Sequence, residues 1–260
     1  MEKIRNYKTY TDGMAKTFAD KAWFVEKLPP HIDTLIDFGC ADGAFIAYIE
    51  RTYPNRFKYF IADDNDDKML RTAKKNLLPL WNEHRITFQL GLNDLSVLDT
   101  PTSVLVLNSV LHEVFSYCEP KEYNEFFANI RRLGVPIIAI RDMNIDFCSS
   151  PFQSLFEMAQ YFKHARPEMW NSMKTWGSDA IDAISFLLKY RYQENWEREK
   201  DEHYLWNIEE IAPRELKGHY KVQEAEKFFI PFIFEQAKRD FPALEFQPFT
   251  THIKMLLAAA

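Results

Sequence analysis

The chain contains few cysteines. Only Cys40, Cys118 and Cys148 occur in 260 residues, and no two of them have the C-x-x-C spacing. An odd, scattered set argues against both a disulfide framework and a zinc site, and no other metal-ligand cluster is evident. We therefore expect a protein of the reducing cytoplasm that holds no metal ion.

Long hydrophobic runs are also missing. No uninterrupted apolar stretch approaches the roughly 20 residues that a membrane-spanning helix needs, and residues 1–6 lack the apolar core of a signal peptide. With 47% hydrophobic and 27% charged residues, the chain can bury a full core, which excludes a disordered chain. We expect a soluble protein without a membrane partner.

An excess of positive charge is absent as well. The formal net charge is −6, so no global basic surface indicates a nucleic-acid partner. The exception would be a local patch formed by Lys163, Arg166, Lys174, Lys189 and Arg191. Nucleic acid is therefore the less favoured partner.

Glycine is scarce, yet two of the seven glycines stand close together after an apolar run. Residues 34–46 are typical of a buried strand that ends in an acid, a tight loop through Gly39 and Gly43, and the start of a helix. Such a loop lets the backbone approach a ligand, and the helix start offers unpaired N–H groups. Because Ala41 stands at the second glycine of G-x-G-x-x-G and the last glycine is missing, the pattern disfavours NAD.

The same segment resembles the first motif of class I S-adenosylmethionine-dependent methyltransferases, an acid-x-Gly-x-Gly-x-Gly loop after the first strand. Asp37, Gly39, Ala41 and Gly43 occupy its positions, with Ala41 as the one departure from glycine. The resemblance implies S-adenosylmethionine as cofactor, with the loop running under its methionine part. A purely structural strand-to-helix turn is the alternative.

The second predicted strand ends in Asp63 and Asp64. A carboxylate at this place can accept hydrogen bonds from both ribose hydroxyls. In the family this acid stands four residues before a Met-Leu pair, here Met69-Leu70, which implies Asp64 with Asp63 as the one-residue alternative. Asp66 is a candidate helix cap.

A third strand is predicted for residues 85–90. Family members most often place an acid after it, against the adenine ring, but this chain has Gly91 there. Leu92, Asn93 and Asp94 are the candidates to replace that contact.

The continuously apolar run 103–107 is typical of a strand buried on both faces of a parallel sheet. It delivers Asn108, a candidate cofactor contact, and His112 to the carboxyl edge, where open α/β sheets bind ligands. The segment also looks like the one after strand four in many small-molecule methyltransferases. A lone histidine is often only a structural hydrogen-bonding group. His112 is nevertheless the first candidate for a catalytic base, followed by Glu113 and Asp142.

The N-terminal residues 7–28 carry apolar positions at helical spacing. In many class I methyltransferases such a helix closes over the cofactor. The resemblance therefore makes Tyr7, Tyr10 and Lys21 candidate pocket residues, although surface or packing roles are commoner for residues of these types.

The remaining pattern completes an α/β fold. Helices are predicted for residues 44–53, from 65 onward, and for 120–133, and a fifth strand for 135–142, where Arg141 is expected either to pair with Asp142 or to contact substrate. Later elements are a helix at 207–216, a strand at 219–225, a helix at 228–240 and a last, antiparallel strand within 244–257. We expect a doubly wound, seven-stranded, mostly parallel sheet of the class I methyltransferase type.

Between the fifth strand and residue 207 the sequence is helical in character and crowded with aromatics. We predict that residues 1–142 and 207–260 form an S-adenosylmethionine-binding α/β domain and that 143–206 form an inserted helical cap, or lid. The expected activity is methyl transfer to an oxygen, nitrogen or carbon of a small-molecule acceptor under this cap. An RNA methyltransferase and a non-catalytic S-adenosylmethionine-binding protein are the alternatives, and a homodimer is left open.

Overall fold

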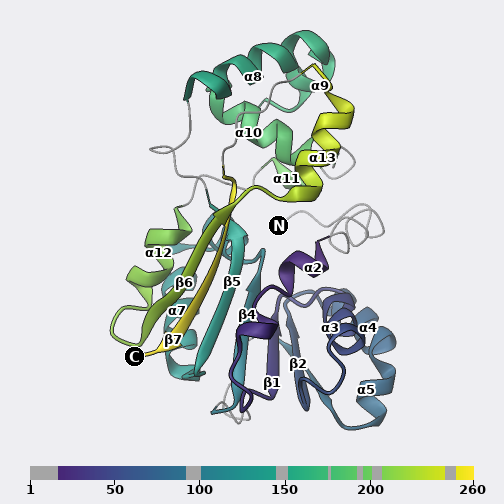
Figure 1. Ribbon diagram of the computed structural model, residues 1–260, viewed down its shortest axis with the longest axis vertical. Coiled ribbons are helices and arrows are strands. Elements are labelled where there is room, and N and C mark those ends of the chain that lie inside the picture. Colours follow the sequence, from purple (N-terminus) through teal and green to yellow (C-terminus); the bar gives the residue numbers. More distant parts are fainter. Residues whose placement is uncertain are drawn as a thin grey trace.

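The computed structural model describes residues 17–91, 101–144, 152–174, 177–191, 196–200, 207–243 and 250–260. Within them seven strands form one sheet in the order β3-β2-β1-β4-β5-β7-β6, in which β7 runs antiparallel to both of its neighbours (Figure 1). The strands are β1 (Thr34–Phe38), β2 (Tyr59–Asp64), β3 (Ile86–Leu90), β4 (Ser103–Asn108), β5 (Ile137–Met143), β6 (Tyr220–Phe228) and β7 (His252–Ala259). The predicted α/β fold class is confirmed.

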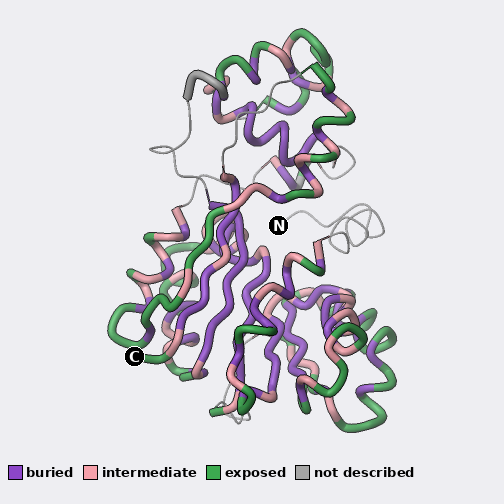
Figure 2. The backbone as a smooth tube through the Cα atoms, in the orientation of Figure 1, coloured by how far each residue is buried: buried purple, intermediate pink, exposed green. Residues whose placement is uncertain are grey.

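Helices cover both faces of this sheet, which explains why its central strands are apolar without alternation. One face packs on α3 (Ala44–Thr52) and α4 (Asp67–Asn76), and α5 (Leu78–Asn82) follows at the outer end. The other face packs on α6 (Leu111–Tyr117), α7 (Pro120–Leu133) and α12 (Ile208–Glu215). Figure 2 shows the central strands buried along their length, whereas the edge strand β6 is mostly exposed.

The predicted N-terminal helix is not continuous in its described part, residues 17–28. It consists of α2 (Phe18–Lys21) and the 3-10 turn η1 (Val25–Lys27). The reason is packing. Phe18, Ala22 and Val25 share one face at helical spacing, but Phe24 is buried in the same core and would lie roughly 100° away from Val25 on a straight helix. The chain therefore turns over the carboxyl edge of the sheet.

Beyond β5 lie α8 (Phe152–Ala165), α9 (Pro167–Ser172), α10 (Asp179–Lys189) and α11 (Trp196–Glu199), above the carboxyl edge in Figure 1. Their buried side chains form a separate cluster, the cap core, which includes Phe162, Trp170 and Phe186. The helix α13 (Pro231–Asp240), placed with the α/β domain by sequence, contributes Ile233 and Ala237 to this cap core, and Phe241 follows directly after it. The cap core thus draws on two separate stretches of the chain.

None of the described helices is both long enough and apolar enough to cross a membrane.

Candidate active site

The loop after β1 depends on left-handed backbone. Gly39, Ala41 and Gly43 have φ values of 74°, 49° and 75°. A Cβ atom on Gly43 would lie 2.6 Å from the Leu77 Cδ1 atom, and one on Gly39 would lie 3.0 Å from the Val110 Cγ2 atom. Both positions therefore favour glycine for conformation, and a side chain at either would also crowd Leu77 or Val110. Ala41 retains the left-handed geometry without being glycine.

Asp64 ties this loop to β2. Its Oδ2 atom accepts a hydrogen bond from the Ala41 N–H at 2.8 Å, and its Oδ1 atom accepts one from the Asp66 N–H at 2.8 Å. Asp66 in turn caps α4, as predicted, by accepting from the backbone of Lys68 and Met69. Each Asp64 oxygen keeps a second lone pair for a ribose hydroxyl. Asp63 points to the other face, is 1% exposed, and has one oxygen without a hydrogen bond.

The strand register places five polar side chains on one face of the sheet at its carboxyl edge. Asp37 pairs with Ala62 and Val106, Asn108 pairs with Arg141, and Arg141 pairs with Lys254. Since side chains two residues apart share a face, this polar row runs across the sheet as Asp64, Asp37, Asn108, Arg141 and Lys254. It is acidic on β2 and β1 and basic on β5 and β7.

Within the described residues, the middle of the polar row lacks hydrogen-bond partners. The Oδ2 atom of Asp37 and both terminal atoms of the Asn108 amide are buried and form no hydrogen bond with the part of the chain that the structure describes. Burial, assisted by the charge of Asp64 and opposed by that of Lys21, raises the pKa of Asp37 to about 7. Burial likewise raises the pKa of Asp63 to about 7. Polar groups in this state fit a ligand that carries both donors and acceptors.

The N-terminal helix α2 lies across the basic half of the polar row. Its Asp20 carboxylate accepts from the Arg141 Nε atom at 2.9 Å and contacts the Lys254 Nζ atom at 2.7 Å. Arg141 also donates to the Ser109 hydroxyl at 3.2 Å. The suggested pairing of Arg141 with Asp142 does not form, because consecutive strand residues point to opposite faces.

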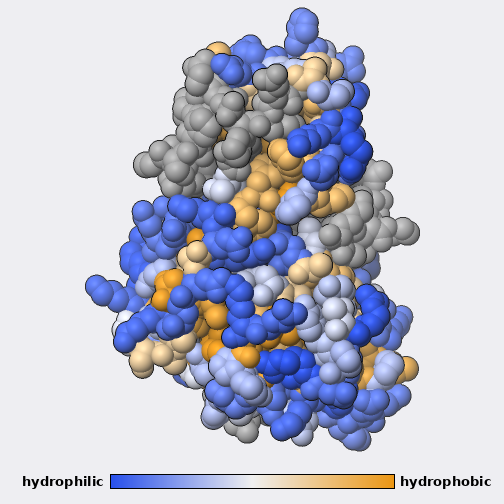
Figure 3. Space-filling view, in the orientation of Figure 1, coloured by the Kyte–Doolittle hydropathy of each residue, from blue (hydrophilic) through white to orange (hydrophobic). Residues whose placement is uncertain are grey.

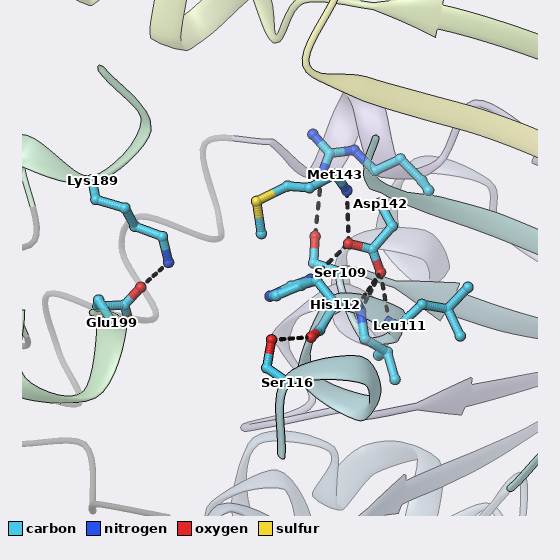
Figure 4. A network of polar contacts seen from close by, with 10 residues as sticks. Ser109, Leu111, His112, Ser116, Asp142, Met143, Lys189 and Glu199 are labelled. Carbon is cyan, nitrogen blue, oxygen red and sulfur yellow. Dashed lines mark hydrogen bonds and ion pairs between the residues drawn. The ribbon is translucent and has the colours of Figure 1, made fainter. Parts of the chain in front are cut away.

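Asp142 instead holds His112. The His112 Nδ1 atom lies 2.6 Å from the Asp142 Oδ1 atom, and the Asp142 Oδ2 atom accepts from the backbone N–H of Val110 at 2.9 Å and of Leu111 at 2.6 Å (Figure 4). A carboxylate at this place favours the tautomer with the proton on Nδ1, which leaves the basic lone pair on Nε2. Asp142 is fully buried behind the ring, and Glu113 is half-buried on α6.

The buried ion pair of Lys189 and Glu199 belongs to the cap. In Figure 4 it lies on the side of the His112 ring that faces away from Asp142, and Met143 extends between the two groups. On the face drawn in Figure 3, apolar side chains gather in the middle of the molecule, where the cap meets the strands. The His112 ring is therefore directed toward the junction of sheet and cap.

Sequence reasoning missed His252. It pairs with Met143 in the sheet, is 4% exposed, and shares a 2.8 Å hydrogen bond with the Thr251 hydroxyl through Nδ1. Burial, then the charge of Arg141 among nearby cations, lowers its pKa well below the usual value. The antiparallel direction of β7 was the available signal, because it brings the start of that strand to the carboxyl edge.

Some sequence candidates fall outside the part of the chain that the structure describes. Leu92, Asn93 and Asp94 lie outside the described residues, as do Tyr7 and Tyr10. Of the suggested basic patch, Lys163 and Lys174 contact Asp179, Lys189 pairs with Glu199, and Arg191 donates to a backbone carbonyl. Of these five side chains, Arg166 is exposed, and within the described part of the chain it forms neither an ion pair nor a side-chain hydrogen bond.

No protein-family model matches the chain, and no curated protein does either. Among solved structures, the methyltransferase domain of bacterial CtHen1-C superposes with a TM-score of 0.51 at 13% identity, over 95% of this chain and 97% of that one. The pyocyanin biosynthetic protein PhzM gives 0.53 at 13% identity, over 95% of this chain and 56% of PhzM, so the chain spans little more than half of PhzM. A candidate S-adenosylmethionine-dependent methyltransferase from Listeria monocytogenes gives 0.50 at 11% identity, over 93% of this chain and 99% of that one.

The chain has the class I methyltransferase fold. In this fold the strand order reverses between β1 and β4, and ligands of open α/β sheets bind outside the carboxyl ends of the strands at such a switch point. Asp37 lies near the carboxyl end of β1 and Asn108 at the carboxyl end of β4, on either side of this switch point. The glycine loop, the polar row and His112 therefore all lie at the carboxyl edge of the sheet.

Proposed function

We propose that the protein is an S-adenosylmethionine-dependent methyltransferase whose acceptor is a small molecule bound between the sheet edge and the cap. The observation that carries the proposal is the set of buried, unpartnered polar atoms on Asp37 and Asn108, beside the glycine loop at the switch point. Their donors and acceptors fit a polar cofactor, and the Ala41 loop with Asp64, or with Asp63 as the one-residue alternative, fits its ribose end. Asp37, Gly39, Ala41, Gly43, Asp63, Asp64 and Asn108 would hold it.

When bound, S-adenosylmethionine supplies a sulfonium methyl group that is open to in-line attack. Because this displacement needs little acid catalysis, the protein contributes mainly orientation and exclusion of water. An acceptor hydroxyl or amine must also lose a proton. We assign that role to the His112 Nε2 atom, with Asp142 holding the ring and stabilising the imidazolium.

A small acceptor suits the cap better than a nucleic acid does. Three of the five cations that could form a basic patch contact acids within the cap, and the net charge is negative. An RNA methyltransferase would instead bind RNA with an affinity that falls steeply as the salt concentration rises.

Calorimetric titration of the purified protein with S-adenosylmethionine and S-adenosylhomocysteine tests the cofactor. We expect saturable binding of both ligands, weakened in Asp37→Asn and unchanged in Asp67→Asn. Asp67 is a matched control because its carboxylate is exposed on α4 and pairs only with Arg71 in the described ion pairs. No binding of either ligand to the parent protein would refute the proposal.

A non-catalytic binding protein is separated from an enzyme by turnover. The protein is incubated with S-adenosylmethionine and a panel of phenols, amines and carboxylic acids, and S-adenosylhomocysteine is quantified. Acceptor-dependent release supports the enzyme, whereas tight cofactor binding without release across the panel supports the alternative.

A further inference from the structure

Two neighbouring residues of α2, Asp20 and Lys21, carry opposite charges and differ in whether those charges are paired. Asp20 is held by two cations, Arg141 and Lys254, and so anchors the helix on β5 and β7. Lys21 follows immediately and is only 3% exposed. The anchored helix thus delivers a buried ammonium group to the edge of the sheet.

The Lys21 ammonium is buried but not paired. Among the described residues neither an ion pair nor a hydrogen bond joins it to another side chain, although Lys58 and Lys254 each contact an acid. Burial, then the charge of Arg141, lowers the pKa of Lys21 to about 8, while Asp37 and Asp142 oppose that change. A lysine is almost never fully buried without a partner, because its charge loses hydration without compensation.

Asp37 is a buried acid that, like Lys21, forms no ion pair among the described residues. Asp37 is 3% exposed and keeps a buried oxygen without a hydrogen bond, and the charge of Lys21 acts on it without forming an ion pair. The unpartnered Asn108 amide lies on the same face, two strand positions beyond the residue that pairs with Asp37. One buried cation, one buried acid and one amide at the same edge therefore all lack partners among the residues that the structure describes.

A ligand that carries both an ammonium and a carboxylate would give partners to Lys21, Asp37 and Asn108. We propose that Lys21 binds the carboxylate of the cofactor's α-amino-acid group, while Asp37 accepts from its ammonium. Asp20 is then a positioning residue, since its contacts to Arg141 and Lys254 fix the helix that carries Lys21. This inference rests on the proposed function and deepens it by assigning the amino-acid end of the cofactor.

Three ligands separate the parts of the claim in calorimetric titrations. S-adenosylhomocysteine carries both charged groups, its decarboxylated analogue keeps only the ammonium, and 5′-methylthioadenosine has neither. The variant is Lys21→Met, which keeps the length of the side chain and removes its charge. Lys75→Met is the matched control, because Lys75 is exposed on α4.

The Lys21→Met variant should bind S-adenosylhomocysteine roughly tenfold to a hundredfold more weakly than the parent protein, the range expected for one charge-assisted contact. Its affinities for the decarboxylated analogue and for 5′-methylthioadenosine should match those of the parent and of Lys75→Met. Unchanged S-adenosylhomocysteine affinity in Lys21→Met overturns the inference, and so does an equal loss for all three ligands, which would make Lys21 merely structural. If the parent protein binds none of the three, the proposed function itself fails.

Discussion

At the scale of single residues, the site holds acids in an unfavourable state. Asp37 is buried with an unpartnered oxygen, and its pKa is raised to about 7. The folded protein therefore binds a proton at this carboxyl that the unfolded chain releases near its usual pKa. That contribution to stability is present in acid and is lost as the pH rises toward 7. Above pH 7 the buried charge weakens the unliganded fold.

Asp37→Asn should consequently stabilise the unliganded protein at pH 8, by roughly 2–4 kcal/mol. The gain should shrink at pH 5, where the folded parent already carries the proton. Urea denaturation at both pH values measures the difference, and Asp67→Asn should show neither effect. A variant less stable than the parent at pH 8 would mean that Asp37 supports the fold.

His112 offers a kinetic prediction at the same scale. His112→Asn should lower kcat by roughly 10²–10⁴-fold, the usual contribution of a general base, for an acceptor that must lose a proton. S-adenosylhomocysteine affinity should stay close to that of the parent. His219→Asn, a change at an exposed histidine, is the control. If the two variants turn over equally fast, His112 is structural and its bond to Asp142 serves only the fold.

Sequence reasoning identified the side chains at the strand ends but not their partners. Asp37 and Asn108 lie at the ends of apolar strands and His112 follows one, and that position alone places them at the carboxyl edge. The contacts of Asp20 and His252 depend on which faces meet in three dimensions. No local pattern of the chain records those contacts.

At the scale of elements, strands were predictable because fully buried strands leave continuous apolar runs. The observed β1 to β5 begin and end within about two residues of the predicted bounds, in line with the usual uncertainty of element ends. The α2 and η1 pair was not predictable, because a helical period in the sequence competes there with the burial of Phe24. Packing outweighs local propensity at such a place.

The glycine loop yields the element-scale prediction. Gly43→Ala should destabilise the protein by about 2 kcal/mol or more, because left-handed backbone is strained for alanine and the new methyl group meets Leu77. Gly218→Ala is the matched control, since its φ is 82° and no atom lies within 4 Å of the added Cβ. It should cost about 1 kcal/mol.

Urea denaturation of both variants measures the two costs, and their difference isolates the contact with Leu77. Equal losses would show that this contact relaxes at no cost and that the backbone conformation alone demands glycine at position 43.

At the scale of the whole molecule, the core around the sheet is separate from the cap core, and the chain passes from one to the other more than once. Phe241, after α13, packs its ring 4.9 Å from that of Phe162 and 5.2 Å from that of Tyr190. The predicted boundary near residue 207 follows the order of the sequence, whereas this contact joins a later helix to the earlier insertion. Long-range aromatic packing of this kind is not encoded in a local period.

Phe241→Ala should therefore weaken the cap more than the sheet, with a loss of about 3–5 kcal/mol typical of a buried phenylalanine. Hydrogen exchange should show lower protection in α8 and α10 and nearly unchanged protection in β4 and β5. Phe127→Ala, in the core between the sheet and α7, is the control with the reverse pattern. Loss of protection confined to α13 would contradict a shared cap core.

The central claim is that the switch point of this sheet binds S-adenosylmethionine through the glycine loop and the polar row. A crystal structure of the protein grown with saturating S-adenosylhomocysteine tests it most directly. The account predicts the amino-acid group between Lys21, Asp37 and Asn108, the ribose hydroxyls at Asp64 or Asp63, and the sulfur directed toward His112. Crystals in which this edge stays empty, or in which the ligand binds elsewhere, would contradict the account.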